Sequence, residues 1–175
     1  MTVSRTLGEW IKLYEEKTGD KVDLPKDYRL FYMAERGFAQ MKPDDEGKML
    51  IINHVCGDGK FWHDVAELVA VQHGLTCLGT LCTRRIEPYI RAFGWKIEKR
   101  FCFISPDSNP GKVEYRYLCR DGIGRAVVIT ESGIDEKGNE NYLVTHYLQQ
   151  GVEPDLQNAA GAVEVSLEGG GYADV

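Results

Sequence analysis

The feature that most constrains the fold is a run of four consecutive patterns between residues 49 and 82. Residues 49–55 are nearly continuous in apolar side chains, which predicts a strand buried on both faces. The turn Gly57-Asp58-Gly59 follows, and residues 61–73 then carry apolar side chains at helical spacing. Residues 75–82 form a second apolar run. Strand, glycine turn, helix and strand in this order predict a mainly parallel crossover of an α/β domain.

The N-terminal part predicts a helix and a hairpin. Leu7, Trp10, Ile11 and Tyr14 have the i, i+3, i+4, i+7 spacing of an amphipathic helix, with Thr6 as N-cap and Gly19 as its end. Residues 24–34 are ambiguous, and a short second helix that opens at Pro25 and Asp27 and runs through Met33 is one interpretation. Two strand-like runs, 38–41 and 49–55, flank a Pro, Asp and Gly segment and predict a β-hairpin.

The C-terminal part is richer in strands. Residues 86–93 predict a helix stopped by Gly94, and residues 95–104 predict a strand. Three alternating runs separated by turn residues then predict an antiparallel β-meander; they are residues 113–119, 126–130 and 142–148. The whole pattern predicts an α/β (α+β) fold with a central mixed sheet flanked by helices and a C-terminal β-meander.

The length of 175 residues suits one domain with an extension. We expect residues 1–110 to form the main domain, 111–150 the meander extension, and 151–175 a Gly-rich acidic tail that is flexible in the isolated protein. The tail holds five acidic residues and no lysine or arginine, which leaves 22 acidic against 21 basic residues in the body. A body without clustered cations predicts no nucleic-acid partner.

Composition also bears on the compartment. There is no run of about 18 apolar residues, so no membrane span is expected. The first ten residues meet charged side chains at once and do not resemble a secretory signal. Five cysteines without a close pair, of which Cys77 and Cys82 lie in an apolar run, are typical of a reducing cytoplasm or of a particle assembled there.

The segment His54-Val55-Cys56-Gly57-Asp58-Gly59 has the spacing of a known signature, (Gln/Arg)-x-x-Gly-x-(Gly/Ala). With the order of elements around it, the stretch from Met49 to Lys96 resembles the acetyl-CoA-binding half of the GNAT (Gcn5-related N-acetyltransferase) superfamily. A helix N-terminus preceded by glycines also suits a pyrophosphate on physical grounds, because its free N–H groups and partial positive charge favour an anion. An ordinary turn with Asp58 as helix N-cap fits the same residues, and both interpretations stay open.

The resemblance implies an acetyl-CoA-dependent N-acetyltransferase. Its implied cofactor-binding residues are Ile52, Asn53, Val55, Gly57, Asp58, Gly59, Lys60 and Thr83. As catalytic candidates it implies His54, as a base or cofactor contact, and Tyr89, as the acid that protonates the leaving thiolate. Each of these two side chains also fits a purely structural role. The acceptor would be a small-molecule or protein amine.

The chain departs from the family pattern at three positions. His54 stands where the family prefers Gln or Arg, Thr83 falls on the Asn position, and Ile90 falls on the Tyr position next to Tyr89. A second hypothesis follows: a catalytically degenerate GNAT-like protein that acts as a structural or binding module. It would dock on a protein partner or a second copy through residues 113–175, and it is similar to proteins of tailed bacteriophages and prophages, including virion components.

Other chemistries have little support. His54, Cys56 and His63 lack metal-ligand spacing, so no metal site is expected. A Cys56–His54 nucleophile lacks a supporting pattern, and there is no phosphate-binding Walker loop or nucleophile elbow.

Overall fold

The structure is a computed structural model that describes residues 2–83, 85–104, 113–156 and 162–167. The chain divides into two compact units, residues 1–78 and 79–175, which are described in turn. Both contain helices and strands, so the mixed α/β class expected from the sequence is confirmed. The expected domain boundaries at residues 110 and 150 stay a prediction.

The first unit contains an antiparallel sheet with strand order β1-β2-β3 and two helices. Its elements are α1 (Leu7–Thr18), β1 (Arg29–Met33), β2 (Gly37–Asp44), β3 (Met49–Gly57) and α2 (Gly59–Gln72). Strand β4 (Cys77–Cys82) spans the division between the units. The antiparallel pairing of β2 with β3 confirms the predicted hairpin.

Residues 24–34 contain a turn followed by strand β1, and not the short helix that Pro25 and Asp27 left open. The Tyr28 amide donates to the Pro25 carbonyl in a turn, and residues 29–33 then pair in unbroken register with residues 37–41 of β2. This pairing satisfies the backbone groups of β1 that face β2, so the sheet overrides the local helical signal.

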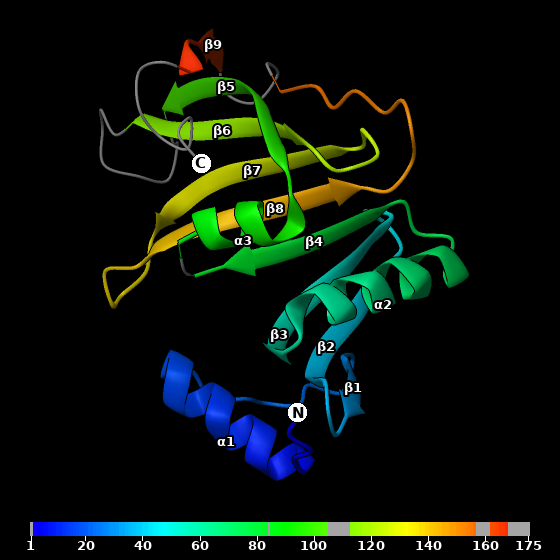
Figure 1. Cartoon of the computed structure of the whole chain (residues 1–175). Helices are drawn as coiled ribbons and strands as arrows, with labels where there is room; N and C mark the ends of the chain where they lie inside the picture. Colours follow the sequence, from blue (N-terminus) through cyan, green and yellow to red (C-terminus); the bar gives the residue numbers. More distant parts are fainter. Residues whose placement is uncertain (1, 84, 105–112, 157–161, 168–175) are drawn as a thin grey trace. The chain divides into compact units, whose positions relative to one another are not determined.

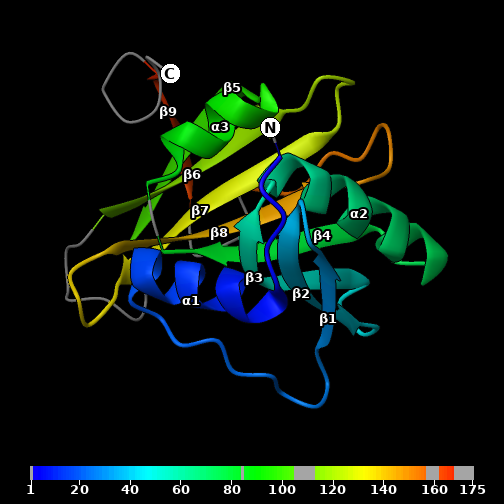
Figure 2. The ribbon, with the colours of Figure 1, turned by 60° about the horizontal axis from the view of Figure 1, so that its bottom comes forward.

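Helix α1 forms as the sequence predicts. Thr6 and Glu9 build a capping box at its start, and Gly19 ends it with a φ of 75°. Its apolar side packs on the sheet, where Trp10, Phe38 and Cys56 form a buried cluster. Figure 2 shows α1 lying across the strands β2 and β3.

Strand β3 is less buried than its apolar sequence predicts. Leu50 and Cys56 are buried, whereas Asn53 is exposed and the other residues from 49 to 55 are half-buried. The pairing of β2 with β3 is irregular in the middle of the strand. The irregularity falls at Asn53 and His54, the two polar residues of an otherwise apolar run.

In its described residues, the second unit is an antiparallel sheet with strand order β8-β7-β6-β5-β9 and one helix. Its elements are α3 (Glu87–Phe93), β5 (Lys96–Ile104), β6 (Val113–Arg120), β7 (Ala126–Ile134), β8 (Glu140–Tyr147) and β9 (Val163–Val165). The predicted meander is confirmed as β6, β7 and β8. In Figure 1 α3 crosses one face of this sheet, and its Ile86 and Ile90 pack there on Tyr117 and Ile129.

Two hairpin turns of the meander have the same design. In each, an aspartate Oδ1 accepts hydrogen bonds from the amides two and four residues later, and a glycine three residues later has a positive φ. The first turn starts at Asp121 and contains Gly124; the second starts at Asp135 and contains Gly138.

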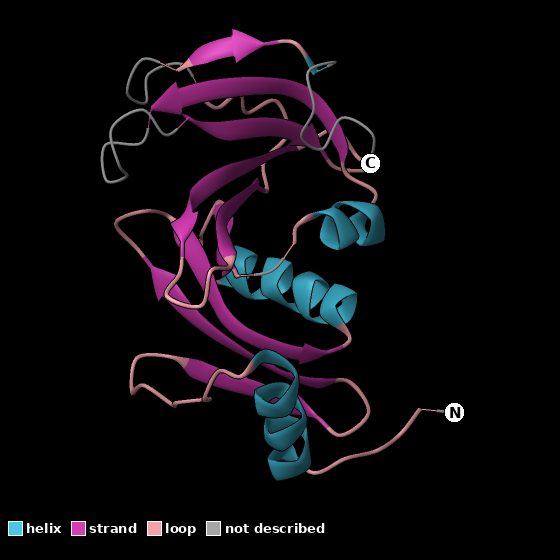
Figure 3. Ribbon diagram, turned by 90° about the vertical axis from the view of Figure 1, so that its left-hand side faces the viewer, coloured by secondary structure: helices cyan, strands magenta, loops and turns pink. Residues whose placement is uncertain are grey.

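The acidic tail is folded where the structure describes it, contrary to the flexibility expected from its composition. Leu156 and Ala162 are buried with Phe101 and Leu118 on the other face of the second sheet. Strand β9 pairs antiparallel with β5 and is the short strand at the top of Figure 3. Apolar residues spaced along a polar tail thus cover the sheet and its edge. Residues 157–161 and 168–175, which include the Gly169–Gly171 run, lie outside the described residues.

Arginines from β5 and β6 hold this tail. Arg120 pairs with Glu153 at 2.8 Å, Arg116 donates to the Leu156 carbonyl at 3.2 Å, and Arg100 donates to the Ser166 carbonyl.

Among the residues described, no helix is both long and apolar enough to cross a membrane.

Candidate functional site

The first glycine of the signature is required by the fold. Gly57 has a φ of 99°, and a Cβ added to it would lie 2.2 Å from the Arg36 carbonyl oxygen. Gly57 pairs with Gly37 of β2, which is equally tight. Two glycines facing each other let the end of β3 approach β2 closely. The fold alone therefore explains why residue 57 is a glycine, without any ligand.

Asp58 is the N-cap of α2, as the alternative interpretation of the signature predicts. Its Oδ1 accepts a hydrogen bond from the Phe61 amide at 3.0 Å, and its Oδ2 pairs with Arg36. The hydrogen bond from Phe61, followed by the one from Arg36, keeps the pKa of Asp58 below its ordinary value. The carboxylate is thus ionised and occupies part of the positive end of α2.

The second glycine is in the opposite situation. A Cβ on Gly59 would meet no atom within 4 Å, and its φ is not positive. Lys60, the next residue, is exposed. Gly59 and Lys60 thus present an open, cationic surface at the first turn of α2, and the fold itself places no demand on residue 59.

Strand β3 contains a β-bulge three residues before the glycine turn. Val55 pairs with Ala39 and Ile52 pairs with Met41, so Asn53 and His54 together lie opposite Gln40. A bulge adds an unpaired residue and redirects side chains, and bulges are frequent next to active sites. Four implied site residues, 52 to 55, therefore lie on or beside the bulge.

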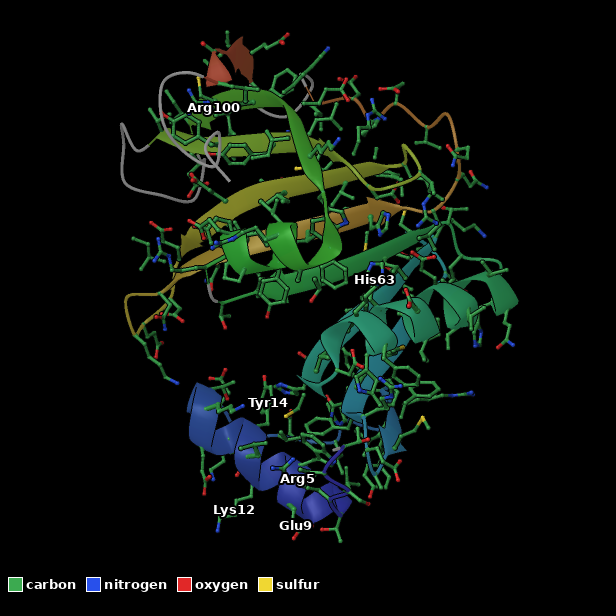
Figure 4. All side chains as sticks on the ribbon, viewed as in Figure 1. Arg5, Glu9, Lys12, Tyr14, His63 and Arg100 are labelled. Carbon is green, nitrogen blue, oxygen red and sulfur yellow. The ribbon has the colours of Figure 1, made fainter. Side chains whose placement is uncertain are left out.

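His54 makes polar contacts through both ring nitrogens. Its Nδ1 lies 2.8 Å from the Tyr14 hydroxyl, and its Nε2 lies 3.7 Å from Oδ1 of Asp23. The imidazole is 14% exposed. Figure 4 shows Tyr14 on the side of α1 opposite to Lys12 and Glu9, and the Tyr14 ring meets the His54 ring edge-on at 5.1 Å.

The second residue of the bulge reaches the same loop. Asn53 donates to Oε1 of Gln40 at 3.2 Å, and Gln40 donates through Nε2 to the carbonyl of Asp23 at 2.5 Å. Gln40 is fully buried. The bulge, the buried amide and the segment around Asp23 thus form one polar network, which sequence reasoning missed because Gln40 and Asp23 carry no local motif.

Thr83 and Tyr89 belong to the second unit. Thr83 contributes to a pocket of ≈ 260 Å³; its lining residues are Thr83, Arg85, Gly138, Asn139, Glu140 and Tyr142. Tyr89 is 39% exposed, whereas Ile90, which falls on the family's Tyr position, is buried in the core. The neighbouring positions of α3 thus point in different directions, as a 100° step predicts.

A buried ion pair in the second unit also escaped sequence reasoning. His146, which is 3% exposed, contacts Oδ2 of Asp121 through Nε2 at 2.8 Å, and Arg125 donates to the same oxygen at 2.7 Å. Burial raises the pKa of Asp121, but the hydrogen bonds from Arg125 and His146 outweigh it, and the pKa falls to about 2. The sequence shows only a turn aspartate and a strand histidine 25 residues apart.

None of the five cysteines forms a disulfide in the described part of the chain, and most of them resemble packing residues more than nucleophiles. Cys56, Cys77 and Cys119 are buried. Burial raises the pKa of the Cys82 thiol to about 11 and that of Cys119 to about 12. These two thiols are therefore protonated at neutral pH.

No protein-family model matches the chain. Comparisons with curated proteins and with solved structures return no match either. The resemblance to the GNAT superfamily thus rests on the residues and on the order of elements alone.

Proposed function

We propose that the chain is a GNAT-like N-acetyltransferase that transfers the acetyl group of acetyl-CoA to an amine. The observation that carries the proposal is the bulge at Asn53 and His54 of β3, which ends three residues before Gly57 and the turn into α2. It puts a histidine with two polar partners next to the helix N-terminus that the resemblance assigns to the cofactor. Acetyl transfer to an amine needs a group of this kind to remove a proton.

The residues at the start of α2 fit a pyrophosphate in part. Gly59 has open space in front of it, Lys60 is exposed, and Arg36 supplies a second cation near the turn. Asp58 opposes an anion, because its carboxylate already caps the Phe61 amide. Its ion pair with Arg36 is half-exposed, and exposed pairs contribute only about 0–1 kcal/mol, so an anion that recruits Arg36 has little to displace.

Release of the CoA thiol tests this function. The full-length protein is incubated with acetyl-CoA and either a polyamine, a lysine-containing peptide or buffer alone, and free thiol is measured with a chromogenic disulfide. We expect amine-dependent thiol release by the wild type and a loss of about 100-fold in His54→Asn. The matched control is His73→Asn at the end of α2, which we expect to leave the rate unchanged.

A second candidate function is the non-catalytic module, and the position of Asp58 favours it. A carboxylate that caps the helix and pairs with Arg36 imitates a bound phosphate, which is what a degenerate cofactor loop would contain. Such a protein would bind a protein partner or another copy through residues 113–175, of which the structure describes 113–156 and 162–167. Absence of thiol release with every amine would favour this candidate.

A further inference from the structure

Asp23, His54 and Tyr14 stand in the order carboxylate, imidazole, hydroxyl. The Tyr14 hydroxyl is within hydrogen-bond distance of Nδ1, and the Asp23 carboxylate faces Nε2 at 3.7 Å, which is an electrostatic contact and not a hydrogen bond. This is the order of groups in hydrolase triads, where the carboxylate orients the imidazole and the imidazole takes the hydroxyl proton. Here the hydroxyl belongs to a tyrosine on α1.

We propose that Asp23, His54 and Tyr14 form a proton relay that ends at the Tyr14 hydroxyl, which takes the proton from the acceptor amine. The inference rests on the proposed acetyl transfer and adds a catalytic residue, Tyr14, that no signature in the sequence indicates.

The surroundings hold Tyr14 and His54 in a defined geometry, whereas the Asp23 side chain is 76% exposed. Tyr14 packs edge-on against Phe38 at 5.9 Å as well as against His54, so its ring is fixed from two sides. The β3 bulge sets the direction of His54. Gln40, fully buried, accepts from the bulge residue Asn53 and donates to the Asp23 carbonyl, which keeps the Asp23 segment beside the imidazole. Three separate elements thus converge on the imidazole.

Acetyl transfer moves the amine proton through Tyr14 to His54. When the amine nitrogen bonds to the acetyl carbon and the carbon–sulfur bond breaks, the amine proton passes to the Tyr14 oxygen. The hydroxyl proton of Tyr14 passes at the same time to Nδ1 of His54, and the charged imidazole lies beside the Asp23 carboxylate. The leaving thiolate takes a proton from solvent, and the imidazole returns its own to solvent.

The relay requires one tautomer of His54, which ¹⁵N NMR of the labelled full chain measures directly. In the neutral imidazole the proton must be on Nε2, so that Nδ1 accepts from the Tyr14 hydroxyl. We expect Tyr14→Phe to shift the Nδ1 resonance. Tyr32→Phe, which removes a hydroxyl bonded to the Arg5 carbonyl in the same unit, should leave it in place. A neutral imidazole with its proton on Nδ1 overturns the relay, because Tyr14 would then be the acceptor.

The thiol-release assay separates the relay from the function on which it rests. Tyr14→Phe should lower the rate about 100-fold while Tyr32→Phe does not, and Asp23→Asn should change the pH profile of the rate. Equal rates in Tyr14→Phe and wild type overturn the relay alone. No amine-dependent release by the wild type overturns the proposed function. Thermal melting of each variant shows that its fold is intact.

Discussion

Gly57→Ala is expected to destabilise the chain by about 3 kcal/mol or more, whereas Gly59→Ala leaves its stability unchanged within about 0.5 kcal/mol. An alanine Cβ at residue 57 would lie 2.2 Å from the Arg36 carbonyl at a φ of 99°, and backbone on both sides prevents relief. At residue 59 the same methyl group meets open space. Urea unfolding of the two variants measures the difference in free energy.

The comparison matters for interpreting the signature. Gly57 and Gly59 are equivalent in the sequence pattern, but the fold requires a glycine only at residue 57. Loss of ligand binding in a Gly57 variant would therefore reflect misfolding, and a Gly59 variant reports on the ligand alone. Equal destabilisation by both alanines would contradict the geometry of the turn.

Asp121→Ala is expected to destabilise the chain by about 3–5 kcal/mol, because it leaves His146 and Arg125 without their shared carboxylate. Asp135→Ala is the matched control. Asp135 accepts the same two turn amides but is only half-buried, and its described side-chain partner is Asn139 and not a buried histidine, so its loss should cost about 1 kcal/mol, as for a helix cap. Similar values for the two variants would show that the Asp121–His146 contact contributes little.

The stabilisation by the Asp121 carboxylate depends on pH with a definite sign. The pKa of Asp121 falls from an ordinary value of 3.8 to about 2 in the folded protein. The unfolded chain thus binds the proton more readily, and the stabilisation is present above pH 3.8 and lost as the pH falls through about 2. The shift corresponds to about 2 kcal/mol. Acid unfolding followed by circular dichroism should show this part of the dependence in wild type and not in Asp121→Ala.

Most elements were predictable because their signals are local. The capping box at Thr6, the helix that ends at Gly94 and the alternation of β6 to β8 each depend on neighbouring residues. The errors fall where distant pairing decides. Residues 29–33 become a strand because β2 offers an edge, and the tail folds because Leu156 and Ala162 meet an apolar face built by residues from β5 to β7.

The candidate site was predictable only in part, for the same reason. The loop from Gly57 to Lys60 has a motif, and its N-cap follows from Asp58 alone. The bulge depends on the register between two strands, and the partners of His54 come from α1 and from the loop after it. Tyr14 and His54 are 40 residues apart in the sequence, so spacing alone does not predict that the Tyr14 hydroxyl lies 2.8 Å from Nδ1 of His54.

Calorimetric titration with acetyl-CoA tests the central claim most directly, in wild type, Gly59→Ala and Gly59→Asp. The open space at residue 59 lets all three fold, so equal urea midpoints serve as the control. If the cofactor binds at the start of α2, the wild type binds it in the micromolar range. Gly59→Asp adds a second negative charge there and does not bind it. No binding by wild type at millimolar acetyl-CoA would contradict the acetyltransferase and leave the non-catalytic module.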